Sequence, residues 1–172
     1  MFRLISAFII GCFYVLAQTA TAQLTWSPVF FSEDDTLRVK FGASAGNGDL
    51  EGFDGDVYLY AGVITSQSTS NTDWKYVKPS GPDSWSSFPS YLKMTPSEDD
   101  EWSFTFSPSI REFFSVSESE DVEQLALLFR GESNGEVVKV GRMSDGSDWF
   151  IPLESTGISL TRISPAQDFT FC

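Results

Sequence analysis

The chain has 172 residues, with 24 acidic against 11 basic side chains and no histidine. A net charge of −13 repels phosphate groups, so neither nucleic acid nor an anionic membrane surface is an expected partner. The lack of histidine excludes serine–histidine and cysteine–histidine catalysis and histidine-bound zinc, which leaves a carboxylate pair or an oxygen-ligated metal.

The first 22 residues have the pattern of a secretory signal peptide. Arg3 precedes an apolar run from Leu4 to Leu16, and Ala20-Thr21-Ala22 offers a cleavage site before Gln23. As an alternative, Ile9-Ile10-Gly11-Cys12 resembles a bacterial lipobox with Cys12 as the lipidated residue. The apolar run is shorter than the roughly 20 residues of a membrane-spanning helix. We therefore expect a secreted or cell-surface protein with no membrane span.

Residues 23–156 are expected to form one domain, since this length is typical of a single folded unit. Cleavage after Ala22 would leave Cys172 as the only thiol, so the domain is expected to be stabilised by packing without an intramolecular disulfide. A new strand-like pattern begins at Ile158–Ile163, and the sequence closes on Phe169-Thr170-Phe171-Cys172. We interpret residues 157–172 as the start of a second, truncated domain.

Short segments with alternating apolar and polar residues dominate the chain. Thr36–Gly42 places Leu37, Val39 and Phe41 on one face and two basic residues on the other, as in a strand with one buried face. Val57–Ile64 is apolar on both faces, so this strand is expected to be covered on both sides or to carry a contact surface. Further strand-like segments are 73–77, 101–106, 122–130, 136–141 and 149–153.

Turn and helix signals separate these strands. Ser133-Asn134-Gly135 is a hairpin signal, and Ser144–Asp148 is a second turn. Ser107–Phe114 predicts one short helical turn, with Ser107 as the N-cap and Pro108 at the first helical position. Roughly seven to nine antiparallel strands with hardly any helix indicate an all-β sandwich.

Several blocks of sequence resemble a known module. GNGDLEGFDGDVYLYAGVITSQSTSNTDWKYV, followed by SPSIREFFSV, VEQLALLFR and GSDWFIPL, is similar to an N-terminal module of secreted α-amylase-family proteins of Bacteroidota. The resemblance covers about Leu24 to Leu153. It implies a non-catalytic, immunoglobulin-like sandwich that precedes further domains in glycoside hydrolases or in cell-surface starch-handling lipoproteins. It does not fix the ligand, which has to be argued from the residues.

The glycine- and acid-rich stretch before the strand at 57–64 has two interpretations. Calcium prefers six to eight oxygen ligands, and Asp49, Glu51, Asp54 and Asp56 could supply some of them. Their spacing does not match the twelve-residue calcium loop. The favoured interpretation is a structured turn whose glycines at 46, 48, 52 and 55 adopt positive φ. No cofactor is expected otherwise.

An aromatic set is the candidate sugar site, because indole and phenol rings stack on the CH-rich faces of sugars. Trp74 and Tyr76 are two residues apart and are expected to share a strand face, and Trp85 lies in the polar loop SGPDSWSSF. In the alternative, Trp74 and Tyr76 face inward and Trp85 plugs its loop. Trp102 is expected in the core. The candidate donors to sugar hydroxyls are Lys75, Lys78 and Lys93.

Acidic side chains are abundant but do not predict an active site. Glu98–Glu101 and Glu118–Asp121 are polar runs that are expected to be solvated, and a glycosidase needs a buried acid with a partner at a fixed separation. We therefore expect no catalysis by this chain. The favoured function is α-glucan binding beside further domains of the same polypeptide. The alternative is a structural spacer with no sugar site.

Overall fold

The computed structural model describes residues 24–44, 46–98 and 100–154. The predicted signal peptide, the Cys12 alternative and the predicted second domain at 157–172 lie outside the described residues. Within them, no helix is long and apolar enough to cross a membrane.

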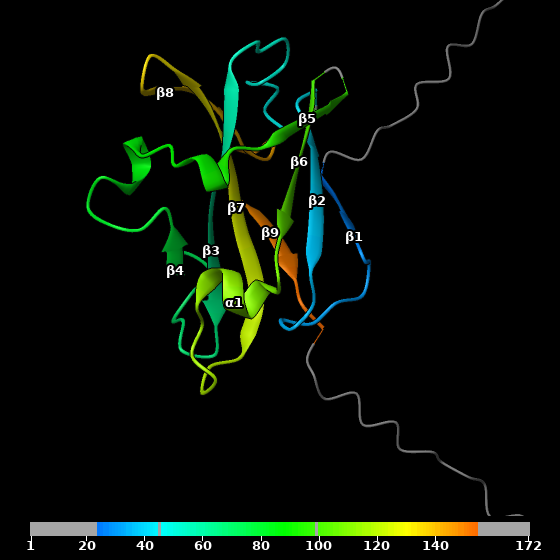
Figure 1. The fold of residues 1–172 in the computed structure, drawn as a ribbon, viewed down its shortest axis with the longest axis vertical. Helices are drawn as coiled ribbons and strands as arrows, with labels where there is room; N and C mark the ends of the chain where they lie inside the picture. The colour runs from blue at the N-terminus through cyan, green and yellow to red at the C-terminus, as the bar shows by residue number, and fades with distance from the viewer. Residues whose placement is uncertain (1–23, 45, 99, 155–172) are drawn as a thin grey trace, which may run out of the picture.

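Two antiparallel sheets form the molecule and lie side by side in Figure 1. Sheet A has the strand order β1-β2-β6-β5, and sheet B has the order β4-β3-β7-β8 with β9 also paired to β7. Read in chain order, this is the strand arrangement of an immunoglobulin-like sandwich, in which the last strand is divided into β8 and β9. The predicted fold class is confirmed. The strands are β1 (Leu24–Ser27), β2 (Leu37–Gly42), β3 (Asp56–Thr65), β4 (Lys75–Lys78), β5 (Thr95–Glu98), β6 (Glu101–Phe106), β7 (Val122–Ser133), β8 (Glu136–Gly141) and β9 (Trp149–Pro152).

The core lies between the two sheets and follows the predicted alternation. In β2, Leu37, Val39 and Phe41 are buried while the residues between them face outward. The ring centroid of Phe41 lies 4.0 Å from that of Phe129 in β7, with 15° between the ring planes. Trp102 in β6 is 5% exposed, so the prediction that it is a core residue is confirmed.

The predicted hairpin between β7 and β8 is also confirmed. Its two loop residues are Asn134 with φ 56° and Gly135 with φ 81°, the positive values that a type I′ turn requires. Because this turn twists in the same sense as the strands, it joins them without a longer loop.

The predicted helical turn exists, but its cap is different. Helix α1 (Ile110–Phe114) begins after Ser109, whose hydroxyl accepts the N–H of Glu112 at 3.2 Å. The prediction of Ser107 as N-cap and Pro108 at the first helical position is wrong. The sequence Ser109-Ile-Arg-Glu112 has the capping-box spacing, which places the cap two residues later.

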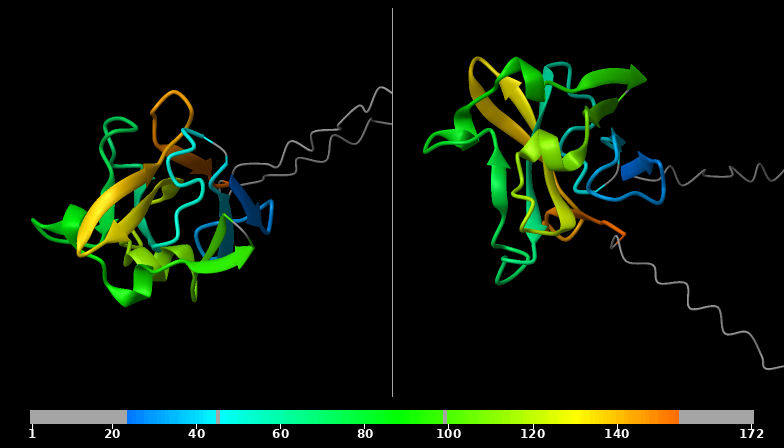
Figure 2. Two further views of the ribbon diagram at one scale, coloured as in Figure 1. Left: turned by 90° about the horizontal axis from the view of Figure 1, so that it is seen from above. Right: turned by 60° about the horizontal axis from the view of Figure 1, so that its bottom comes forward.

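The segment between β4 and β5 covers part of the outer face of sheet B. It contains two short 3₁₀ turns, η1 (Ser84–Ser86) and η2 (Ser90–Leu92). Figure 2 shows the segment that follows β4, in green, on the outside of the molecule and away from β1 and β2. Since β3 is buried on both faces over most of its length, the prediction of a two-sided apolar strand is confirmed.

Candidate functional site

The glycine-rich stretch before β3 forms a series of turns. Gly46, Gly48 and Gly52 have φ of 69°, 69° and 66°, as the turn interpretation predicts. For Gly55 the prediction of positive φ is wrong: a Cβ at this position would lie 2.5 Å from the ring of Phe53, so glycine is needed for space. In the described ranges, no three acidic or cysteine side chains are grouped as a metal site would require, so the calcium alternative gains no support.

Gly46→Ala is expected to lower the free energy of unfolding by about 2–3 kcal/mol, because left-handed backbone and overpacking both add strain. A Cβ at Gly46 would lie 1.9 Å from the carbonyl oxygen of Arg142. Gly52→Ala is the matched control, since its φ is similar and no atom lies within 4 Å of its added Cβ. Urea unfolding should give only about 1 kcal/mol for this control. Equal losses for the two variants would contradict the turn packing described here.

Tyr76 and Trp74 do not share a face, contrary to the sequence prediction. Tyr76 has φ 53°, and the β3–β4 register shifts at this point, which reverses the alternation of β4. Its ring packs on the core, and its hydroxyl donates to Glu120 Oε1 at 2.8 Å. Tyr76 is therefore a structural residue. The prediction that Glu118–Asp121 is only a solvated run is wrong at Glu120, which also accepts the Thr65 hydroxyl at 2.9 Å.

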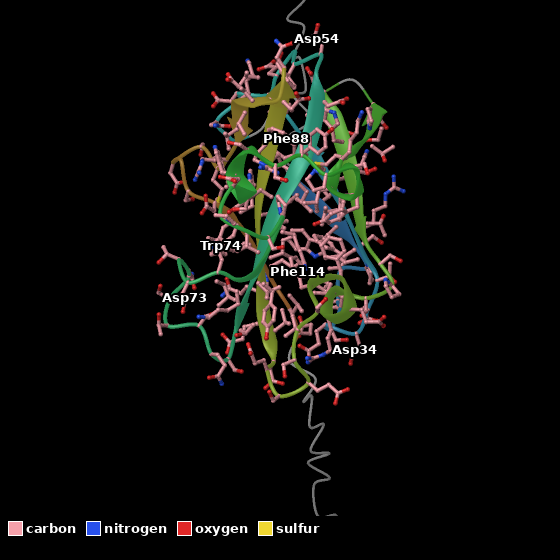
Figure 3. The ribbon with its side chains drawn as sticks, turned by 60° about the vertical axis from the view of Figure 1, so that its left-hand side comes forward. Asp34, Asp54, Asp73, Trp74, Phe88 and Phe114 are labelled. Carbon is pink, nitrogen blue, oxygen red and sulfur yellow. The ribbon has the colours of Figure 1, made fainter. Side chains whose placement is uncertain are left out.

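Trp74 lies on the outer face of sheet B, where Figure 3 shows it next to Asp73. Its indole N–H donates to the carbonyl of Asn71 at 3.0 Å, which ties the ring to the preceding turn. Gly62 of β3 lies beneath it: a Cβ there would be 3.2 Å from Trp74 Cβ. The glycine in β3 therefore lets the indole lie close against the strand.

Trp85 is 39% exposed and lies in η1. Its ring centroid is 5.4 Å from that of Tyr60, with 70° between the planes. The two sequence interpretations of Trp85, display and plugging, are thus both partly met, because one side of the ring packs and the rest is open.

Tyr60 of β3 brings the two tryptophans together. Its ring centroid lies 6.1 Å from that of Trp74, with 40° between the planes, in addition to its contact with Trp85. We call Trp74, Tyr60 and Trp85 the aromatic platform. Phe150 of β9 packs against Trp74 in a T-shaped arrangement, with a centroid separation of 6.3 Å and 82° between the ring planes.

An open pocket of about 380 Å³ is lined by Tyr60 and Trp74 of the platform, and Trp85 lies outside it, against Tyr60. The lining of the pocket combines apolar and aromatic side chains with the polar side chains of Thr72, Asp73 and Asp148. Asp73 is bonded to Lys75 at 2.9 Å, and this hydrogen bond and those from Thr69 hold the pKa of Asp73 below its usual value. Asp148 is paired with Arg142. The pocket is lined by Tyr60, Thr72, Asp73, Trp74, Val77, Leu128 and Asp148.

The three predicted lysines are not assembled at this pocket. Lys75 does not line the pocket itself, but it binds Asp73, which does. Lys93 binds Asp56 at 2.6 Å and lines a separate pocket against sheet A. Lys78 pairs with Ala61 in the β3–β4 ladder and does not line the pocket. The prediction that the lysines accompany the aromatic residues is therefore met by Lys75 alone.

A buried arginine lies beneath the platform. Arg130 of β7 has no exposed surface, and its guanidinium carbon is 4.9 Å from the Tyr60 ring centroid and 5.8 Å from that of Trp85. Sequence reasoning missed Arg130 and also Tyr60, Leu128, Asp148 and Phe150. The signal that could have found Tyr60 is the second apolar face of the strand at 57–64, because such a face needs a cover or a ligand.

Comparison with models of known protein families finds none that matches this chain. Comparison with curated proteins gives no match either.

Proposed function

We propose that this chain is a non-catalytic module that binds α-glucan on the outer face of sheet B. The observation that carries the proposal is the aromatic platform beside an open pocket with carboxylates at its edge. Sugar rings offer CH-rich faces to aromatic rings and hydroxyl groups to carboxylates. A stripe of rings next to Asp73 and Asp148 offers both kinds of contact within one site.

The angles between the rings favour a curved glycan. The planes of Trp74 and Trp85 are inclined to that of Tyr60 by 40° and 70°. A flat β-1,4-linked ribbon stacks best on rings that lie in one plane. An α-1,4-linked chain turns along its length, so its successive sugars lie at different angles. The rings of the platform are likewise inclined to one another.

Trp74→Ala is expected to weaken binding to soluble starch about tenfold, because one stacking contact contributes on the order of 1–2 kcal/mol by analogy with other contacts on rings. Affinity electrophoresis in starch-containing gels measures this as loss of retardation. Tyr91→Ala is the matched control, since Tyr91 is an exposed aromatic residue outside the platform (55% exposed). Wild-type protein that migrates equally with and without starch, amylose or maltooligosaccharide would overturn the proposal.

The proposal includes no hydrolysis by this chain. Glu101 pairs with Lys40 at 2.5 Å, and Glu120 accepts hydrogen bonds from Thr65 and Tyr76, so these two acids have structural roles. Glu98 is 74% exposed and 3.8 Å from Lys40, so it lacks the burial that a catalytic acid needs. The resemblance to modules of α-amylase-family proteins supports a position beside further domains of a secreted polypeptide.

A spacer function is the second candidate, and one observation favours it. Val29 and Phe30, between β1 and β2, are 68% and 78% exposed. They lie next to Phe31 in sequence, and the carbonyl of Phe31 accepts the N–H of Glu154 at 3.0 Å. The exposed pair is therefore close to the segment that follows β9. A domain that packs on a neighbour would present such a surface. If starch does not retard the wild-type protein, this surface becomes the better guide to function.

A further inference from the structure

Arg130 is a buried cation without an acidic partner among the described residues. Its side chain points to the outer face of sheet B, yet it has no exposed surface and forms no ion pair there. Burial lowers the pKa of Arg130 to about 10, so the group remains charged near neutral pH. Burying an unpaired charge is costly, so its contacts must offset a large desolvation penalty.

Those contacts all lie in the segment that carries Trp85 and in the rings around it. The guanidinium donates to the carbonyl of Ser84 at 3.1 Å, to that of Ser87 at 3.0 Å and to that of Trp85. Its central carbon is 5.0 Å from the Phe88 ring centroid. Arginine suits this role because its planar fork of donors can hold several carbonyl groups at once.

Arg130 supplies the side-chain donors that bind the carbonyl groups of turn η1. The turn has no side-chain cap, and none of its three residues is buried. Its contacts with β3 are those of Trp85 with the Tyr60 ring and of the Ser84 hydroxyl with the Tyr60 hydroxyl at 3.4 Å. Its backbone hydrogen bonds join only residues 81–87 to one another.

We infer that Arg130 is a positioning residue that fixes Trp85 in the aromatic platform. The inference rests on the proposed function, since it assigns a binding role to the platform. It predicts that Arg130 affects glycan affinity through Trp85 and not through Trp74.

A double-mutant cycle on starch affinity tests this coupling. Arg130→Lys keeps the charge but loses the planar fork, and we expect it to weaken binding about three- to tenfold. In a Trp85→Ala background the same change should alter affinity less than twofold. In a Trp74→Ala background it should still weaken binding by its full factor. An equal loss in the Trp85→Ala background would overturn the inference.

Hydrogen exchange of the wild-type protein gives a second test that needs neither ligand nor a folded variant. The amides of Ser86 and Ser87 bond to the carbonyls of Asp83 and Ser84, in a turn that Arg130 holds. The amide of Glu51 bonds to the carbonyl of Gly48 at 3.0 Å, in a turn whose carbonyls accept no side-chain donor among the described residues. After correction for intrinsic rates, we expect Ser86 and Ser87 to exchange at least tenfold more slowly than Glu51.

Equal exchange rates would overturn the clamp, even if the separate affinity measurement shows that the protein binds starch. Slow exchange together with no starch retardation would overturn the proposed function and leave Arg130 as a purely structural clamp, which also refutes its positioning role in binding. Slow exchange together with the expected cycle supports both proposals.

Discussion

Phe41→Ala is expected to lower the free energy of unfolding by about 3–5 kcal/mol, the largest effect we predict for a single core residue. The Phe41 ring lies between the sheets, stacked on Phe129 at 4.0 Å and 6.5 Å from both Trp102 and Trp149 by ring centroids. A Cβ on Gly141 would come within 2.6 Å of it, so the site is tightly packed and the loss of the ring would leave a cavity.

Phe30→Ala is the matched control, because the same change is made on a side chain that is 78% exposed. Urea unfolding should place this variant within about 0.5 kcal/mol of the wild type. If the free energy of unfolding of Phe41→Ala were as close to that of the wild type as the value for Phe30→Ala, the stacked rings would not be the centre of the core. Starch affinity should not change in folded Phe41→Ala, since Phe41 lies on the inner side of the sandwich.

Glu33→Ala should cost about 2–4 kcal/mol, because removing one partner of a buried pair leaves the other partners unsatisfied. Glu33 is 7% exposed and accepts two donors: the guanidinium of Arg111 in α1, and the N–H of Val122 at 2.7 Å. One carboxylate thus joins the β1–β2 loop, the helix and the first residue of β7.

Asp34→Ala provides the control for charge alone. The Asp34 carboxylate is 3.7 Å from Arg111 Nε but its side chain is 72% exposed, and pairs of this kind contribute about 0–1 kcal/mol. Thermal and urea unfolding of the two variants should therefore differ clearly. A loss for Glu33→Ala no greater than that for Asp34→Ala would refute a structural role for the buried carboxylate.

The strands that were predicted correctly are those whose sequences are rich in apolar residues, whether these alternate with polar residues, as in β2, or run along both faces, as in β3. Strand β6 matches its prediction at both ends, and the hairpin after β7 follows from the chemistry of Asn134-Gly135. The edge strands β1 and β5 were not predicted. The β5 sequence Thr95-Pro-Ser-Glu98 is exposed throughout, so it has no apolar alternation, and only its pairing with β6 makes it a strand.

The candidate site was predicted only in part, because two local events determine it. A single residue with positive φ, Tyr76, reverses the alternation that places side chains on one face or the other. Arg130 follows an apolar run, and from the sequence it resembles a solvent-exposed residue at the end of a strand. In the structure the β4–β5 segment covers it. Neither event changes composition or periodicity, so neither can be inferred from the pattern.

The pairing of β3 with β7 also has a consequence for how the chain folds. Asp56 pairs with Glu132 and Thr65 with Val122, so the central ladder of sheet B joins segments that are far apart in sequence. Topologies dominated by such distant contacts fold slowly, on the order of milliseconds to seconds. The reason is that the chain loses the conformational entropy of closing a long loop before the hydrogen bonds of the ladder can form. Until β7 is available, the apolar strand VYLYAGVI has no neighbour on that edge and is prone to pair with other chains. A fragment that ends before residue 122 should therefore aggregate instead of forming a smaller stable sandwich.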